Sequence, residues 1–304
     1  MRIHQKTIKR SVSCSGVGLH TGVKSTVVFN PSSENSGINF VRTDVPDSIP
    51  IPADVHWVVS SVRGTTIGRD GLNILTIEHI LSAVYGLGID NLTIELSAKE
   101  PPAMDGSAIH FVEILQQAGI VDQVALKDYI VIQEPLTYAD PNFEIEMNIV
   151  PQDNFMVSCS IDYGIAPLGK QEFTISSMKD FPEMIAPART FCLLSEVEGL
   201  LNIGLAKGGS LENTVVFLDT EIEQVDYKLL KENFGISEEI MTRSNGILNR
   251  EKLRFDDEPV RHKTLDLIGD FALLGKSIKG HVTAKKPSHT MNVEMVKKIK
   301  EIYS

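Results

Sequence analysis

The sequence predicts an α+β protein made of two similar β-α-α-β domains, packed face to face with the functional site in the crevice between them. In each half of the chain, short strand-like segments precede an apolar helix that begins near a histidine and ends at glycine. A further strand and a further helix follow in each half. The halves share this order without sharing residue identity, which indicates a weak internal repeat.

The first domain is expected to cover residues 1–124. β-Branched and aromatic residues bounded by Pro, Ser and Gly are typical of hairpin strands, and glycines after an apolar periodic segment are typical of helix ends. On these patterns the expected elements are strands at 25–29, 37–41 and 91–96 and helices at 77–85 and 108–118. Residues 120–127 are expected to form the domain junction.

The second domain is expected to cover residues 128–304. Its expected elements are strands at 129–132, 143–150, 155–163 and 278–284 and helices at 260–274 and 290–302. An insertion at about 185–251 has an apolar segment followed by a glycine turn. Ordinary helix packing is the simpler interpretation of its leucines. The functional interpretation is the wall of a passage for the apolar tail of a ligand.

Composition excludes several classes of protein. The net charge of −11, from 29 basic and 40 acidic residues, leaves no excess of Lys and Arg to neutralise a nucleic acid. Three cysteines without a C-x-x-C motif exclude a disulfide framework and indicate a reducing compartment. The polar segment after the basic N-terminus does not fit a signal peptide, and no stretch approaches the about 18 apolar residues of a transmembrane segment. We therefore expect a cytoplasmic protein. That it is a monomer acting on a small molecule is a separate expectation, which composition does not establish.

The most informative polar residues are His262 and Asp266, four positions apart in an otherwise apolar helical segment. Side chains at i and i+4 lie on the same face of a helix, a spacing with which two residues share a metal ion. Asp270 continues the stripe by one turn. A single His-x-x-x-Asp motif is weak, but an unpaired carboxylate buried in an apolar helix would be costly. The best third ligand is His79, which opens the other apolar helix beside Glu78.

Two histidines and one carboxylate suit a catalytic zinc ion with an open coordination position, although iron(II) accepts the same ligands. Zinc acidifies a bound water and polarises a carbonyl group. Glu78, in the first turn of its helix, is placed to act as general base. Asp270 is better suited to orient a proton-donating histidine, for which His289 is the candidate. Lys263 flanks the stripe and is placed to stabilise an oxyanion, so the pattern predicts a metallohydrolase.

Seven motifs occur together and in order, from about Thr7 to Asn292. They are Gly16-Val-Gly-Leu-His-Thr-Gly22, Thr76-Ile-Glu-His79, Gly86-Leu-Gly-Ile-Asp-Asn91, Met104-Asp-Gly-Ser-Ala108, Ala188-Arg-Thr-Phe191, Gly208-Gly-Ser210 and Arg261-His-Lys-Thr-Leu-Asp-Leu-Ile-Gly-Asp270. With this set the chain resembles the bacterial UDP-3-O-acyl-N-acetylglucosamine deacetylases, the zinc amidases of lipid A biosynthesis. The resemblance implies the two-domain β-α-α-β architecture. It also implies hydrolysis of the N-acetyl group of the acylated UDP-sugar to UDP-3-O-acyl-glucosamine and acetate, the committed step of lipid A biosynthesis.

The resemblance also implies roles for individual residues. The metal ligands would be His79, His262 and Asp266, and the catalytic residues Glu78, His289, Asp270, Lys263 and Thr190, the last through a hydroxyl that helps to hold the oxyanion. The substrate-binding residues would be His20, Tyr163, Phe191, Val197, Gly209 and Ser210, with Phe191 and Val197 in the acyl-chain passage and Tyr163 stacked on uracil. A basic residue near the pyrophosphate has no clear counterpart in the 139–143 turn, where Asn142 is nearest.

Two other classes of function stay open at the level of sequence. In a kinase-like or phosphate-binding protein, the turn at 207–210 would hold phosphates, but it lacks the Gly-x-x-x-x-Gly-Lys-Ser/Thr arrangement. In a noncatalytic, metal-stabilised binding module, four protein ligands would close the metal site, and the sequence offers three. Elemental analysis with and without chelation separates these classes.

Overall fold

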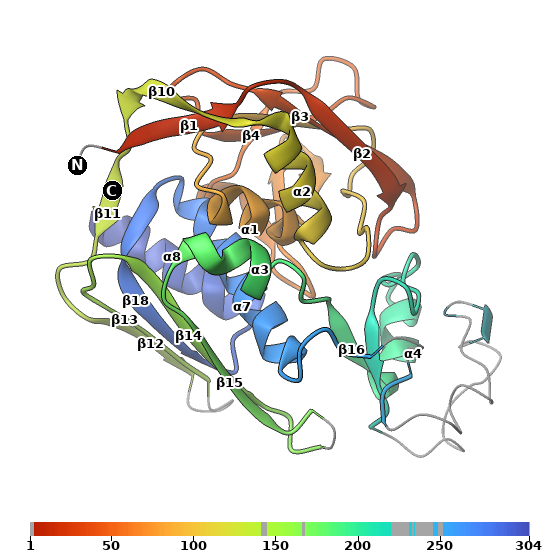
Figure 1. The fold of residues 1–304 in the computed structure, drawn as a ribbon. Coiled ribbons are helices and arrows are strands. Elements are labelled where there is room, and N and C mark those ends of the chain that lie inside the picture. The colour runs from red at the N-terminus through yellow and green to blue at the C-terminus, as the bar shows by residue number, and fades with distance from the viewer. Residues whose placement is uncertain are drawn as a thin grey trace.

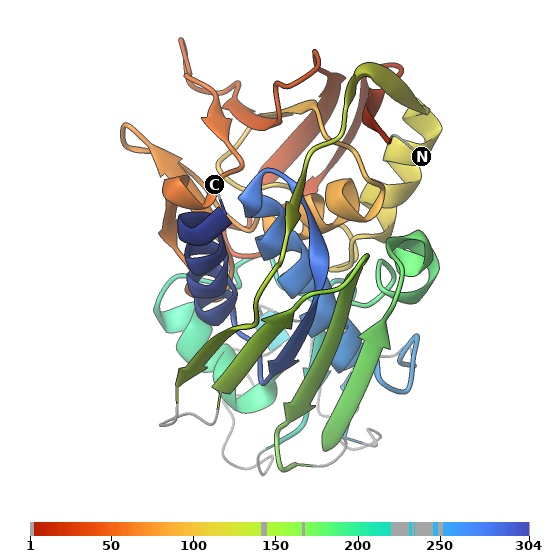
Figure 2. The same ribbon diagram turned by 90° about the vertical axis from the view of Figure 1, so that its left-hand side faces the viewer.

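Two mixed β-sheets form the outer layers of the molecule, and helices fill the space between them (Figures 1 and 2). The computed structural model describes residues 3–140, 145–165, 168–219, 231–232, 234, 246–248 and 252–303. In this part of the chain, no helix has both the length and the apolar character that crossing a membrane requires.

The first sheet has the strand order β2-β3-β9-β4-β5. Its strands are β2 (Val12–Val17), β3 (Lys24–Pro31), β4 (Ile38–Arg42), β5 (Ile51–Pro52) and β9 (Leu92–Leu96). The central strand β9 is antiparallel to β3 and parallel to β4. Helices α1 (Glu78–Gly86) and α2 (Ile109–Ala118) precede and follow β9 in the chain.

The second sheet repeats this topology with the order β12-β13-β18-β14-β15. Its strands are β12 (Leu136–Asp140), β13 (Ile145–Val150), β14 (Phe155–Asp162), β15 (Lys170–Ile175) and β18 (Ser277–Lys285). The central strand β18 is antiparallel to β13 and parallel to β14, and helices α7 (Glu258–Phe271) and α8 (His289–Tyr303) precede and follow it. The predicted α+β class and the internal repeat are confirmed. In each half the central strand separates the two helices along the chain, so the order there is helix, strand, helix.

The remaining elements connect and extend the sheets. They are β1 (His4–Ile8), η1 (Val55–Trp57), β6 (Val58–Ser60), β7 (Thr66–Arg69), β8 (Leu72–Ile74), β10 (Ile120–Leu126), β11 (Tyr129–Val131), η2 (Met178–Asp180), α3 (Phe181–Met184), β16 (Phe191–Leu193), α4 (Leu194–Asn202), β17 (Val215–Phe217) and η4 (Ala272–Leu274). The predicted junction at 120–127 contains a strand that was not predicted from the sequence, since β10 pairs with β1. β11 instead pairs with β18 of the second sheet. The chain therefore passes between the sheets in the short segment after β10, while the division into two domains stays a prediction.

Helices α1 and α7 pack directly against each other at the centre of the molecule. The apolar side chains of both halves belong to one continuous core cluster, in which Phe29 and Phe111 come from the first half and Phe155 and Phe271 from the second. The described part of the insertion forms the parallel pair β16–β17 with α4 and has its own apolar cluster around Val197 and Leu200. The helical layer thus brings the two predicted half-sites together, and the insertion packs as a separate unit.

A buried ion pair joins the start of the insertion to the start of α7. Arg189 and Glu258 are 3% and 1% exposed, and the Arg189 Nε and backbone N–H both donate to Glu258 Oε1, at 2.8 and 3.0 Å. The backbone N–H of Arg254 donates to the other oxygen at 2.7 Å. The pair fixes the 188–190 segment beside the helix that carries His262.

Replacement of Arg189 by Ala should lower the free energy of unfolding by about 3–5 kcal/mol, because it leaves the Glu258 carboxylate buried without its cation. Urea denaturation measures this. The matched control is Lys170→Ala, which breaks an ion pair with Glu172 that is about two-thirds exposed at both ends; its effect should stay within about 0.5 kcal/mol. Equal losses in the two variants would contradict the structural role of the buried pair.

Candidate metal centre

Three ligand-type side chains converge where α1 and α7 cross. His79 lies in the first turn of α1, and His262 and Asp266 lie one turn apart on α7. Their candidate ligand atoms all lie within 4.8 Å of one another. The distances from Asp266 Oδ1 are 3.3 Å to His262 Nε2 and 3.8 Å to His79 Nε2. A tetrahedral zinc ion needs roughly 3.3 Å between ligand atoms, so small side-chain movements suffice to hold one.

The hydrogen bonding of Asp266 indicates that this cluster suits a metal ion. The side chain is buried, and its Oδ2 accepts a hydrogen bond from Lys263 Nζ at 3.0 Å. Its Oδ1 is also buried but has no hydrogen-bond partner among the described residues, although it faces both imidazoles. A buried carboxylate oxygen without a donor is costly, and a cation between it and two imidazole nitrogens would satisfy it. The three residues therefore fit a divalent metal.

The protonation states of the three residues match those that ligands need. Burial and the neighbouring His262 lower the pKa of His79 to about 3, which keeps it neutral. Burial also lowers the pKa of His262. Its Nδ1 lies 3.1 Å from the carbonyl oxygen of Ala188, so Nδ1 carries the proton and Nε2 offers its lone pair to the cluster. Burial disfavours the charge of Asp266, but His262 and Lys263 outweigh it and hold the pKa of Asp266 far below its ordinary value.

Two further ionisable groups, Glu78 and His289, lie next to each other beside the cluster. His289 Nε2 lies 3.8 Å from Glu78 Oε1 and 3.9 Å from Asp266 Oδ2. Burial raises the pKa of Glu78 to about 7 although His289 opposes the rise. Burial disfavours the charged form of His289, but Asp270 and Glu78 outweigh this effect and raise its pKa to about 9. The structure thus places a carboxylate and an imidazolium within reach of one reacting group.

Asp270 occupies the orienting position predicted for it. Its Oδ2 accepts hydrogen bonds from His289 Nδ1 and from Asn292 Nδ2, both at 2.8 Å. The carboxylate is fully buried on the same face of α7 as Asp266, one turn farther along the helix. His289 is therefore held with Nε2 directed at the metal cluster and Nδ1 tied to α7.

Lys263, Phe191 and Tyr163 lie together at the edge of the cluster. The Lys263 Nζ is 5.7 Å from the centre of the Phe191 ring, and that ring is 6.4 Å from the His262 ring and 5.8 Å from the Tyr163 ring. Burial disfavours the Lys263 cation, but Asp266 outweighs it and raises the Lys263 pKa. A cation and two aromatic rings therefore form one wall beside the candidate metal site.

Two other insertion residues with predicted roles, Thr190 and Val197, make contacts within the protein. The backbone of Thr190 connects Gly106 and Val215, donating to the first at 2.8 Å and accepting from the second at 2.8 Å. Val197 is fully buried in the apolar cluster of the insertion, as the packing interpretation requires. The oxyanion role of Thr190 and the passage-lining role of Val197 stay predictions. Asn142, named for the missing basic residue, lies outside the described residues.

His20 connects the N-terminal loop to two other segments. Its ring Nε2 lies 3.1 Å from the carbonyl oxygen of Arg63, and its Nδ1 accepts from the Ala206 N–H at 3.3 Å. The neighbouring turn is docked on the same loop, with Gly208 N–H donating to the Leu19 carbonyl at 3.0 Å. Both ring nitrogens of His20 contact backbone groups in this structure. Binding of substrate by His20 therefore stays a prediction.

The glycine turn does not present a phosphate cradle. The N–H groups of Gly208, Gly209 and Ser210 all donate within the protein, the last two to Ala206 O and Asn213 Oδ1. Phosphate-binding loops need free backbone N–H groups. The kinase-like alternative therefore loses its only supporting motif, and substrate contacts of Gly209 and Ser210 stay predictions.

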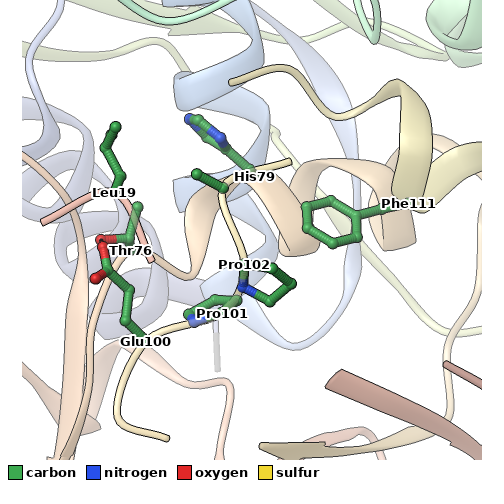
Figure 3. Close-up of a pocket in the computed structure, with 8 residues that line it drawn as sticks. Leu19, Thr76, His79, Glu100, Pro101, Pro102 and Phe111 are labelled. Carbon is green, nitrogen blue, oxygen red and sulfur yellow. Dashed lines mark hydrogen bonds between the residues drawn. The ribbon is translucent and has the colours of Figure 1, made fainter. Parts of the chain in front are cut away.

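Sequence reasoning missed two buried polar residues that fix this region. Glu100 accepts hydrogen bonds from the N–H groups of His20 and Thr21 and from the Thr76 hydroxyl, and it lines the same small pocket as His79 (Figure 3). Thr65 contacts both Glu78 and Asp270. Neither residue stands at a recognisable sequence spacing from its partners. The sequence offered one hint for Glu100, which is a charged residue directly before two prolines.

Comparison with known proteins agrees with this geometry. The family model described as "LpxC: UDP-3-O-acyl N-acetylglycosamine deacetylase" matches residues 5–234 and 218–301. A UDP-3-O-acyl-N-acetylglucosamine deacetylase of Syntrophotalea carbinolica is 41% identical over 298 residues, which cover 98% of this chain and 88% of that protein. Its counterpart in Myxococcus xanthus is 39% identical over 297 residues, covering 97% of this chain and 86% of the relative.

A longer relative also matches. The "Bifunctional enzyme LpxC/FabZ" of Chlorobaculum tepidum is 43% identical over 303 residues, and this chain spans 65% of its length. The matches extend over almost the whole of this chain, including both half-sites and the insertion. The chain belongs to the UDP-3-O-acyl N-acetylglycosamine deacetylase family.

Proposed function

We propose that this chain hydrolyses the N-acetyl group of UDP-3-O-acyl-N-acetylglucosamine, giving UDP-3-O-acyl-glucosamine and acetate, the committed step of lipid A biosynthesis. Family membership supports the substrate class. The observation that carries the chemistry is the buried Asp266 oxygen that faces two neutral imidazoles, with the neighbouring pair Glu78 and His289 beside the cluster. The proposal includes zinc as the metal and His79, His262 and Asp266 as its ligands.

A bound zinc ion would polarise the amide carbonyl and acidify a water molecule. Three protein ligands leave a coordination position open for this chemistry. Lys263, charged beside Asp266, is placed to stabilise the negative charge that develops on the carbonyl oxygen. Its contact with Phe191, next to Tyr163, supports a substrate position along this wall.

Glu78 and His289 divide the proton transfers. Glu78 takes a proton from the attacking water at Oε1, because Oε2 already accepts the Thr65 N–H. As the C–N bond breaks, His289 Nε2 gives its proton to the departing amine, and the acetyl group leaves as acetic acid, which ionises to acetate in solution. Return of the proton from Glu78 to His289, whose atoms are 3.8 Å apart, restores both groups. Their pKa values, about 7 and about 9, leave a pH range in which the first is ionised and the second protonated.

The cysteines support a reducing location for this reaction. Cys14, Cys159 and Cys192 are all free thiols, and burial raises the pKa of each. Buried thiols of high pKa are unreactive. A cytoplasmic location is therefore part of the proposal.

Replacing His79, His262 or Asp266 by Ala should remove bound zinc and activity together, because each supplies one of three protein ligands. Elemental analysis of purified protein and an acetate-release assay measure the two quantities. His56→Ala is the matched control, since that imidazole is 73% exposed and pairs with Asp54. Stoichiometric zinc with full activity in any ligand variant would refute the assignment.

Glu78→Gln should keep zinc at the wild-type level and lower turnover by about 10²- to 10⁴-fold, the range for positioned acid–base groups. Glutamine keeps the size of the side chain and its acceptor for the Thr65 N–H but cannot take a proton. Loss of zinc in this variant would make Glu78 a ligand, and turnover near the wild-type rate would exclude it as the base.

A further inference from the structure

Thr65 lies between β6 and β7 and is fully buried. Its backbone is attached to the start of α1, where no side chain caps the helix. The N–H of Ile77 donates to the Thr65 carbonyl at 3.3 Å, and the N–H of Thr65 donates to Glu78 Oε2 at 3.0 Å. Residue 64 is glycine, and a Cβ there would make a tight contact of 3.0 Å with Glu78 Oε1. Thr65 therefore holds the carboxylate that takes the proton.

The side chain of Thr65 reaches the other helix. Its hydroxyl donates to Asp270 Oδ1 at 2.5 Å, across a separation of 205 residues in sequence. The hydroxyl oxygen is also 3.4 Å from His289 Nδ1. Because that nitrogen already donates to Asp270 Oδ2 at 2.8 Å, the short contact with Oδ1 takes the hydroxyl proton. Thr65 thus supplies the donor for the second oxygen of the carboxylate that orients the acid.

Donors on both oxygens fix the plane of the Asp270 carboxylate. Oδ2 accepts from His289 and Asn292, and Oδ1 accepts from Thr65. Without the hydroxyl, Oδ1 would be buried without that donor, and the carboxylate would rotate or draw in water to regain a hydrogen bond. Either change would move the His289 ring relative to Glu78.

We propose that Thr65 is a positioning residue that sets the distance and orientation between the proton acceptor and the proton donor of the reaction, a role that rests on the proposed function. It acts on Glu78 through its backbone N–H and on His289 through Asp270. Its own hydroxyl is buried and already donates to a carboxylate, so it does not touch substrate. Catalytic groups need to be held within fractions of an ångström of their productive geometry, and one residue that binds both carboxylates does this directly.

The test compares Thr65→Val with Thr65→Ser. Valine keeps the shape and the backbone N–H but removes the hydroxyl, and serine restores the hydroxyl. Thr65→Val should lower kcat by about 10- to 100-fold, the usual effect of removing an outer partner of an active-site group, with KM and zinc content unchanged within about twofold. Thr65→Ser should retain kcat within about threefold. A Val variant with wild-type kcat, or a Ser variant as slow as the Val variant, would overturn the proposal.

A double-mutant cycle separates positioning from general stability. If Thr65 acts through Asp270, adding Thr65→Val to Asp270→Asn should lower kcat by no more than about twofold further. The full loss caused by Thr65→Val in that background would show an effect independent of Asp270 and would overturn the proposal.

Crystal structures of the Val and Ser variants supply a readout that does not depend on turnover. The Val variant should show a rotated Asp270 carboxylate and a displaced His289 ring with Glu78 in place, and the Ser variant should match the wild type. An unchanged His289 in the Val variant would overturn the proposal. Absence of turnover in the wild-type chain would instead refute the proposed function, and the structural comparison would still decide the role of Thr65.

Discussion

The close crossing of α1 and α7 is the constraint on which the rest of the structure depends. A Cβ at Gly269 would collide with the backbone carbonyl of Glu78, so only glycine allows the helices to approach this closely. The crossing brings His79 from one half within ligand distance of His262 and Asp266 from the other. Packing of the two sheet-and-helix units would bury apolar surface in any case. Because glycine lets α1 and α7 approach closely, the shared core also contains ligand side chains from both halves.

The crossing also concentrates charged side chains in the buried interior, and this explains much of the surrounding architecture. Burying an ionised group is costly unless it is paired and hydrogen-bonded. Asp266 is accordingly held by Lys263 on one oxygen, Asp270 is surrounded by three donors, and the 188–190 segment is fixed by the Arg189–Glu258 pair. Within the described part of the chain, two buried oxygens of this network lack a hydrogen-bond partner, Oδ1 of Asp266 and Oδ1 of Asn292. Only the Asp266 oxygen faces the two imidazoles, and this is the position that a metal ion would occupy.

Features that depend on the spacing of nearby residues could be predicted from the sequence. Features that depend on contacts between distant residues could not. The apolar pattern predicted helices α1, α2, α7 and α8 and the strands β3, β4, β9, β11, β13, β14 and β18 within a few residues. The four-residue spacing of His262 and Asp266 predicted one half of the site. β10 was missed because Asp122 and Gln123 interrupt its alternation. Thr65 was missed because its partner Asp270 is 205 residues away and threonine has no distinctive signature. The sequence indicated that the two half-sites meet. It did not indicate that a close contact at Gly269 allows them to meet, because that contact depends on the three-dimensional structure.

The most direct test of this account is the zinc affinity of Gly269→Ala, measured by competition with a chromophoric chelator. The matched control is Gly199→Ala in α4, where an added Cβ meets nothing within 4 Å. If the crossing preorganises the ligands, folded Gly269→Ala should bind zinc at least about 10- to 100-fold more weakly, because His79 moves away from the ligands on α7, while Gly199→Ala should bind like the wild type. Wild-type zinc affinity in folded Gly269→Ala would contradict the central claim.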